Sequence, residues 1–147
     1  MNNADFLKNV PLFAGLAPRH IKNLASSCTE RSFSTGEVIV RQGNPGVGLF
    51  VVVSGRVKIV KTTESGNEID IAEHGPGEVV GEMSVLDGAT RTASVVAVED
   101  TRCLVLASWA FNSFLQNHPE VALEILPVVV RRFRETNEAL LKLKGEA

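Results

Sequence analysis

The hydrophobic pattern of this chain changes its period twice, and that change constrains the fold more than any other feature. Over residues 5–27 apolar side chains recur at helical spacing, with prolines and a glycine between them. This pattern predicts two or three short helices. Over residues 29–106 short β-branched runs replace it, and from residue 108 the helical spacing returns. The chain is therefore expected to form helices, then a block of strands, then helices again.

The middle block contains six short runs rich in β-branched residues, at 37–41, 49–54, 56–62, 69–73, 93–98 and 102–106. Clusters of Gly, Pro, Ser and Asn separate the runs and predict turns. Strands of this length and spacing are typical of an antiparallel sandwich or jelly roll. We predict a mainly β fold, in which an antiparallel β-roll is flanked by short N-terminal helices and by C-terminal helices.

The C-terminal third has clear helix signals. Ser108 is the predicted N-cap of one helix, and Pro119 takes a first-turn position in the next. Pro127 is expected to end or kink that second helix, because proline has no backbone N–H to donate. A last helix is predicted over 128–144, with a length of about 25 Å.

Composition limits the classes of function. With 147 residues, 44% of them apolar and 22% charged, the chain is expected to form one globular domain. Its net charge of −2 provides no general attraction to nucleic acid or to an anionic membrane. No apolar run is long enough for a membrane span, and no signal peptide is recognisable. The two cysteines form no CxxC pattern, which favours reduced thiols and a cytoplasmic location.

Residues 81–94 contain an acid and a base that suit one small ligand. Glu82 stands at the start of a predicted helical turn, and Arg91 follows nine residues later in a loop. Backbone N–H groups at such a turn favour an anion, and an arginine can bind two phosphate oxygens at once. A carboxylate only accepts hydrogen bonds, so Glu82 suits a sugar hydroxyl. A ribose joined to a phosphate would use both groups.

This segment resembles the phosphate-binding cassette of cyclic nucleotide-binding domains. The resemblance rests on two runs, Gly81-Glu82-Met83-Ser84 and Arg91-Thr92-Ala93-Ser94. It implies that Glu82 binds the ribose 2′-hydroxyl and that Arg91 and Thr92 bind the cyclic phosphate, while Met83 offers a backbone group. The ligand-binding residues expected in the cassette are Gly81, Glu82, Met83, Ser84, Arg91, Thr92 and Ala93.

The last predicted helix carries a second signature, Arg131-Arg132-Phe133-Arg134-Glu135-Thr136-Asn137. It is similar to the Arg-Arg-x-x-x-Thr-Ser run of bacterial catabolite-activator-like proteins, whose Thr-Ser pair contacts the adenine. The resemblance implies base contact by Thr136 or Asn137. From the residues alone, the polar pair also fits a break in a helix–helix seam, which can fix register. The three arginines are typical of a solvated helix face.

Two signals bear on the identity of the nucleotide, and they point in different directions. The adenine-like signature favours cAMP, whereas Thr92 can also meet the amino group of a syn guanine. On balance the sequence favours cAMP over cGMP. No spacing of His, Cys and carboxylates indicates a metal site, and neither Ser84 nor Ser94 has a nearby base. We therefore expect a non-catalytic protein that uses no metal.

Together these features predict a cytoplasmic cyclic-nucleotide sensor in which the ligand moves the last helix. One domain, 1–147, is expected, with N-terminal helices at 1–28, a β-roll at 29–106, its cassette at 81–94 and C-terminal helices at 107–144. The apolar stripe of the last helix favours a homodimer, and an effector domain or partner protein would receive the signal. About ten residues follow Asn137, too few for a DNA-reading domain within this chain. The alternative is a protein-interaction module of the same fold that binds no nucleotide.

Overall fold

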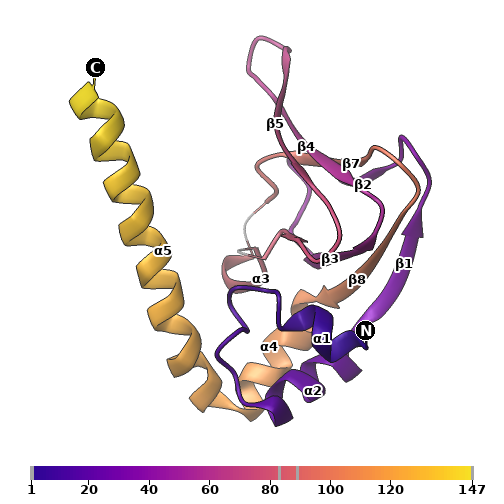
Figure 1. Cartoon of the computed structure of the whole chain (residues 1–147), viewed down its shortest axis with the longest axis vertical. Coiled ribbons are helices and arrows are strands. Elements are labelled where there is room, and N and C mark those ends of the chain that lie inside the picture. Colours follow the sequence, from indigo (N-terminus) through magenta and orange to yellow (C-terminus); the bar gives the residue numbers. More distant parts are fainter. Residues whose placement is uncertain (1, 83, 89, 147) are drawn as a thin grey trace.

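The computed structural model describes residues 2–82, 84–88 and 90–146. Its strands are β1 (Thr29–Phe33), β2 (Val38–Val40), β3 (Gly48–Ser54), β4 (Val57–Thr62), β5 (Glu68–His74), β6 (Val79–Val80), β7 (Ser94–Ala97) and β8 (Thr101–Ala107). They form two four-stranded sheets, with strand orders β1-β8-β3-β6 and β2-β7-β4-β5. Every pair of neighbouring strands is antiparallel. The two sheets make a β-roll (Figure 1), so the predicted mainly β fold is confirmed.

Strand β3 is apolar on both of its faces because both faces are covered. Leu49 and Val51 pack in the cluster that the helices share with the sheet, whereas Phe50 and Val52 pack in the cluster inside the roll. Successive side chains of a strand point to opposite faces, so a continuous apolar run is what a strand buried on both sides requires. The β3 run therefore holds the helices on one side and closes the roll on the other.

The helices are α1 (Asn3–Leu7), α2 (Pro18–Ser26), α3 (Ser84–Asp87), α4 (Ser108–Asn117) and α5 (Pro119–Glu146). Helices α1, α2 and α4 gather at one end of the roll (Figure 1). The rings of Phe13 and Phe111 join the N-terminal segment to α4, with 5.5 Å between their centroids. The two short N-terminal helices agree with the sequence prediction.

Each of the six predicted strands is present, but two further strands escaped prediction. In β1 only Phe33 is buried, so its sequence shows no apolar alternation. Strand β6 has two residues, Val79 and Val80, which is too short for any period to appear. Both strands owe their place to backbone pairing with β8 and β3, a contact that local sequence does not report.

Two details of the C-terminal helices correct the sequence prediction. Helix α5 runs without interruption through Pro127, so the predicted end at that residue is wrong. Val121 and Ile125, before the proline, are buried in the core, and Val128 and Val129, after it, pack against the same cluster. This packing on both sides outweighs the hydrogen bond that the proline cannot donate. The 28-residue helix is therefore about 42 Å long.

Ser108 is not the N-cap of α4. The cap position belongs to Ala107, which makes no side-chain capping bond. Ser108 is instead the first helical residue, and its hydroxyl donates a hydrogen bond to the carbonyl of Gly46 at 3.0 Å. The serine thus connects α4 to the loop before β3.

Beyond its first turns α5 stands beside the roll and away from most of it (Figure 1). Val121 is fully buried, but Leu126, Val130, Phe133 and Leu140 are between 43% and 66% exposed. The C-terminal part of α5 thus carries an apolar face that the described residues leave open. No helix in the described part of the chain combines the length and the apolar character needed to cross a membrane.

Candidate functional site

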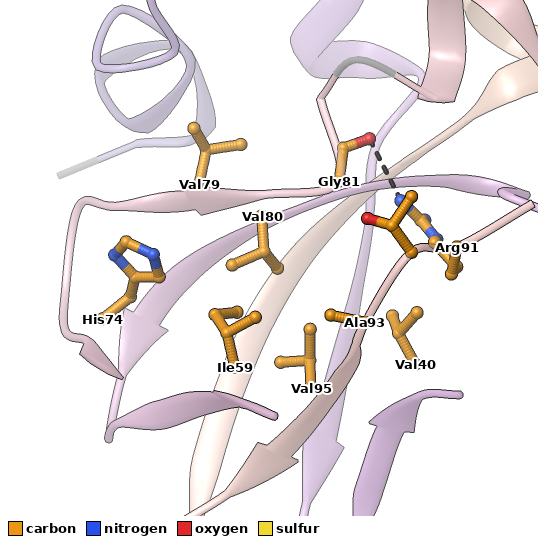
Figure 2. Close-up of a pocket in the computed structure, with 10 residues that line it drawn as sticks. Val40, Ile59, His74, Val79, Val80, Gly81, Arg91, Ala93 and Val95 are labelled. Atoms are coloured by element: carbon orange, nitrogen blue, oxygen red, sulfur yellow. Dashed lines mark hydrogen bonds between the residues drawn. The ribbon is translucent and has the colours of Figure 1, made fainter. Parts of the chain in front are cut away.

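A pocket of about 250 Å³ opens on the roll beside the predicted cassette. Its floor is apolar and comes from several strands, with Ile59 of β4, Val80 of β6 and Val95 of β7 among its residues. Figure 2 shows polar side chains at its two ends, with Arg91 at one end and His74 at the other. The pocket therefore offers a flat apolar surface between two groups that can form hydrogen bonds.

Arg91 is buried, and neighbouring backbone holds it in place. Its guanidinium donates to the carbonyl of Gly81 at 3.2 Å and to the carbonyl of Gly48. Its own N–H donates to the carbonyl of Asn44, and its carbonyl accepts from the N–H of Gly43, each at 2.8 Å. Burial lowers the pKa of Arg91, because removal from water disfavours the charged form. An anion at the pocket would offset that cost.

Gly81 allows the guanidinium of Arg91 to lie against the backbone. The φ of Gly81 is +77°, and a Cβ atom at this position would be 2.8 Å from the Cζ of Arg91. Gly48 is equally constrained, since a Cβ there would be 2.6 Å from the carbonyl oxygen of Leu106. Both contacts exclude larger residues, so these two glycines create the space in which Arg91 lies.

Glu82 connects the cassette to α5. The residue is only 9% exposed. Its Oε1 accepts a hydrogen bond from Nη2 of Arg132 at 2.8 Å, across fifty positions of sequence. Its Oε2 is buried and accepts no hydrogen bond from the described residues. A buried carboxylate oxygen without a donor is costly, so this atom fits a ligand that brings a hydroxyl group.

The other predicted cassette residues differ in how far they can be placed. Gly81, Thr92 and Ala93 line the pocket together with Arg91. Thr92 is exposed, which leaves its hydroxyl accessible. Met83 lies outside the described residues, as does the side chain of Ser84, whose backbone begins α3.

Thr136 and Asn137 are exposed on α5. The hydroxyl of Thr136 donates to the carbonyl of Arg132 at 2.9 Å, one turn earlier in the helix. Neither residue is among those that line the pocket in the described part of the chain. Their contact with a base stays a prediction.

Two residues of the site were missed at the sequence level. Arg132 was expected on a solvated helix face, but it is partly buried and bonded to Glu82. The available signal was the Arg-Arg pair that opens the second signature. His74 lines the pocket from the end of β5, and its Nδ1 lies 2.7 Å from Oε2 of Glu78. No local pattern indicated that this end of β5 would reach the pocket.

No cluster of three or more potential metal ligands of the His, Cys, Asp or Glu type occurs within residues 2–82, 84–88 and 90–146. The chemistry of the described site is that of hydrogen bonding and charge. It provides one buried carboxylate, one buried guanidinium and an apolar surface between Arg91 and His74.

These features define a small-molecule-binding β-roll of the regulatory kind. The sequence pattern of the cyclic nucleotide-binding domain matches residues 30–118, which is more than half of the chain. The chain therefore belongs to the cyclic nucleotide-binding domain family, and it is a regulatory domain of that family.

Known proteins similar to the chain include bacterial and protozoan regulators. A cyclic AMP receptor protein of Thermus thermophilus is 40% identical over 95% of this chain and 65% of its own length. The N-terminal domain of a transcriptional regulator from Streptomyces coelicolor has 37% identity and a TM-score of 0.83, over 92% of this chain and 95% of that domain. The regulatory subunit of a cAMP-independent protein kinase A from Trypanosoma brucei has 28% identity and a TM-score of 0.73, over 95% of this chain and 49% of that subunit. The chain thus spans less than two thirds of the Thermus protein.

The bond between Glu82 and Arg132 generates a prediction for stability. Arg132→Ala should lower the free energy of unfolding by about 1–2 kcal/mol, because a nearly buried carboxylate loses its cation. Arg131→Ala, an exposed neighbour on α5, should change it by less than about 0.5 kcal/mol. In the double variant with Glu82→Gln, the two effects should fail to add. Urea unfolding measures all four proteins, and additive effects would contradict the contact.

Proposed function

We propose that this domain is a non-catalytic sensor of a cyclic nucleotide, preferring cAMP to cGMP, and that binding changes the position of α5. The observation that carries the proposal is the environment of Glu82. One of its oxygens is bonded to α5, and the other is buried and accepts no hydrogen bond from the described residues. The same carboxylate therefore faces the helix and the position where a ribose hydroxyl would bind.

The proposed ligand lies along the pocket. Its phosphate binds at the end that holds Arg91, where the guanidinium supplies charge and Thr92 supplies a hydroxyl. Gly81, Met83, Ser84 and Ala93 would surround the phosphate and ribose, as the family resemblance implies. The ribose 2′-hydroxyl donates to Oε2 of Glu82. The base rests on the apolar floor, a surface suited to the flat face of a purine.

Coupling to α5 follows from the two roles of Glu82. A ligand shifts an equilibrium between two helix positions only if it binds them unequally. A hydroxyl on Oε2 alters the charge and orientation that Oε1 presents to Arg132, so the two interactions are energetically linked. Base contact by Thr136 or Asn137 would add to the difference. The output passes to an effector domain or a partner protein, in the cytoplasm.

The preference for cAMP has support from names and residues, and it has a counterexample. The Thermus relative is named a cyclic AMP receptor protein, and its sequence covers 95% of this chain at 40% identity. The similar subunit from Trypanosoma brucei is described as belonging to a cAMP-independent kinase. The fold alone therefore does not determine the base, and binding must be measured directly.

Arg91→Ala should weaken cAMP binding by about ten- to a hundredfold, because the phosphate loses a charge-assisted hydrogen bond. Calorimetry with cAMP, cGMP and linear AMP measures the affinities. Arg102→Ala is the matched control, since Arg102 is exposed and pairs with Glu30 on the β1–β8 side of the roll. Near-wild-type affinity in Arg91→Ala would contradict the site. If neither cyclic nucleotide binds the wild-type protein, the interaction module becomes the better explanation.

We also propose that a second copy of this chain covers the open face of α5. This face, the terminal seam, consists of Leu123, Leu126, Val130, Phe133, Asn137 and Leu140. Its members alternate in steps of three and four residues, the spacing of a coiled coil. All of its apolar members are at least 43% exposed. A single polar residue within such a seam, here Asn137, is a recognised means of fixing register and the number of strands.

Phe133→Ser should raise the dissociation constant of the dimer by about a hundredfold. Each dimer would lose two buried rings, worth roughly 1.5 kcal/mol apiece. Sedimentation equilibrium measures the constant. Trp109→Ser is the control, because Trp109 is as exposed as Phe133 but lies on α4, outside the terminal seam. A monomeric wild-type protein, or equal effects of the two substitutions, would contradict the dimer.

A further inference from the structure

His74 occupies the end of the pocket that lies away from Arg91. It is the last residue of β5, and its side chain is 29% exposed. Figure 2 shows the apolar side chains Ile59, Val80 and Val95 between the imidazole and the Arg91 end. A nucleotide whose phosphate lies at Arg91 would therefore direct its base toward His74. This residue has no role in the site as developed so far.

Glu78 fixes the hydrogen-bonding role of Nδ1 in His74. The carboxylate of Glu78 has two contacts, since Oε1 accepts from the N–H of Gly75 at 2.9 Å and Oε2 lies 2.7 Å from Nδ1 of His74. The bond from Gly75, and then that with His74, lower the pKa of Glu78, so the group is ionised at neutral pH. An ionised carboxylate only accepts hydrogen bonds, and Nδ1 must therefore carry the proton.

The remaining nitrogen of the ring is fixed by the same constraint. A neutral imidazole has one N–H and one bare nitrogen, and the partner of the first determines the role of the second. With the proton on Nδ1, Nε2 of His74 is an acceptor. Among the described residues, none forms a hydrogen bond with Nε2. The pocket thus has a hydrogen-bond acceptor at its base end.

We propose that His74 makes this pocket select a 6-amino purine over a 6-oxo purine. Adenine presents an amino donor at position 6, whereas guanine and hypoxanthine present an oxygen acceptor there. Nε2 of His74 can accept from the amino group, but it opposes a lone pair on the oxo group. The inference rests on the proposed cyclic-nucleotide site and names a residue that sets its base preference. Glu78 acts through His74 as a positioning residue, because it is absent from the residues that line the pocket.

Glu78→Gln gives a direct test, because it should reverse the tautomer. The N–H of Gly75 still needs an acceptor, so the amide oxygen would take that bond and the amide NH2 would face Nδ1. Nδ1 would then accept and Nε2 would carry the proton. Nitrogen-15 NMR of the imidazole reports the tautomer in the protein without ligand. We expect the Nδ1–H form in the wild type and the Nε2–H form in Glu78→Gln.

Binding to two probes provides the second readout. Cyclic AMP and cyclic IMP share their phosphate and ribose and differ at purine position 6 and at N1, so the ratio of their dissociation constants isolates the base edge. We expect the wild type to favour cyclic AMP and Glu78→Gln to reduce that preference by about three- to tenfold, the worth of one hydrogen bond. Glu73→Gln is the matched control, since Glu73 is exposed on the same strand and bonds to Arg56.

His74→Leu removes the acceptor whatever the tautomer, and it should also reduce the preference. An unchanged ratio in His74→Leu, or a wild-type ring protonated on Nε2, would overturn the inference. An equal loss of affinity for both probes would overturn it as well, because a structural role predicts that result. Failure of the wild type to bind either probe would contradict the cyclic-nucleotide site itself. Normal binding with an unchanged ratio would contradict only the role of His74.

Discussion

The hydrogen bond between Glu82 and Arg132 is the interaction on which the functional architecture depends. It joins the cassette of the roll to the middle of a 28-residue helix whose outer turns are largely exposed. The first turns of α5 pack on the core through Val121 and Ile125, so the helix is anchored at its base. Farther along, Arg132 bonds to a residue of the binding site. Any group that competes for Glu82, or reinforces it, therefore acts on the helix.

Burial gives this interaction its leverage. Glu82 and Arg91 are each 9% exposed, and burying two charged side chains is costly unless both are well satisfied. The protein satisfies them in part, with backbone carbonyls around Arg91 and with Arg132 at one oxygen of Glu82. The second oxygen of Glu82 has no hydrogen bond from the described residues. A ligand with a phosphate and a hydroxyl would compensate these costs, so the site is more favourable with such a ligand than without it.

The sequence predicted those parts of the molecule that depend on local pattern. Six strands and the N-terminal helices follow from hydrophobic period, and the cassette follows from two short runs around Glu82 and Arg91. The rest depends on contacts between distant segments. Strand β1 is defined by pairing with β8, and Arg132 meets a residue fifty positions away. Pro127 misled for the same reason, since core packing on both sides holds the helix through it.

The direct test of this coupling is a distance between α5 and the roll. Spin labels at Glu99→Cys, in the turn before β8, and at Glu138→Cys, on α5, would report it by pulsed electron paramagnetic resonance. Burial raises the pKa of Cys28 to about 12 and of Cys103 to about 11, so the native thiols stay protonated and react slowly with the label. Labelled chains diluted in unlabelled protein restrict the signal to one chain. We predict that saturating cAMP shifts the distance distribution. An unchanged distribution, with binding verified by calorimetry, would contradict the coupling.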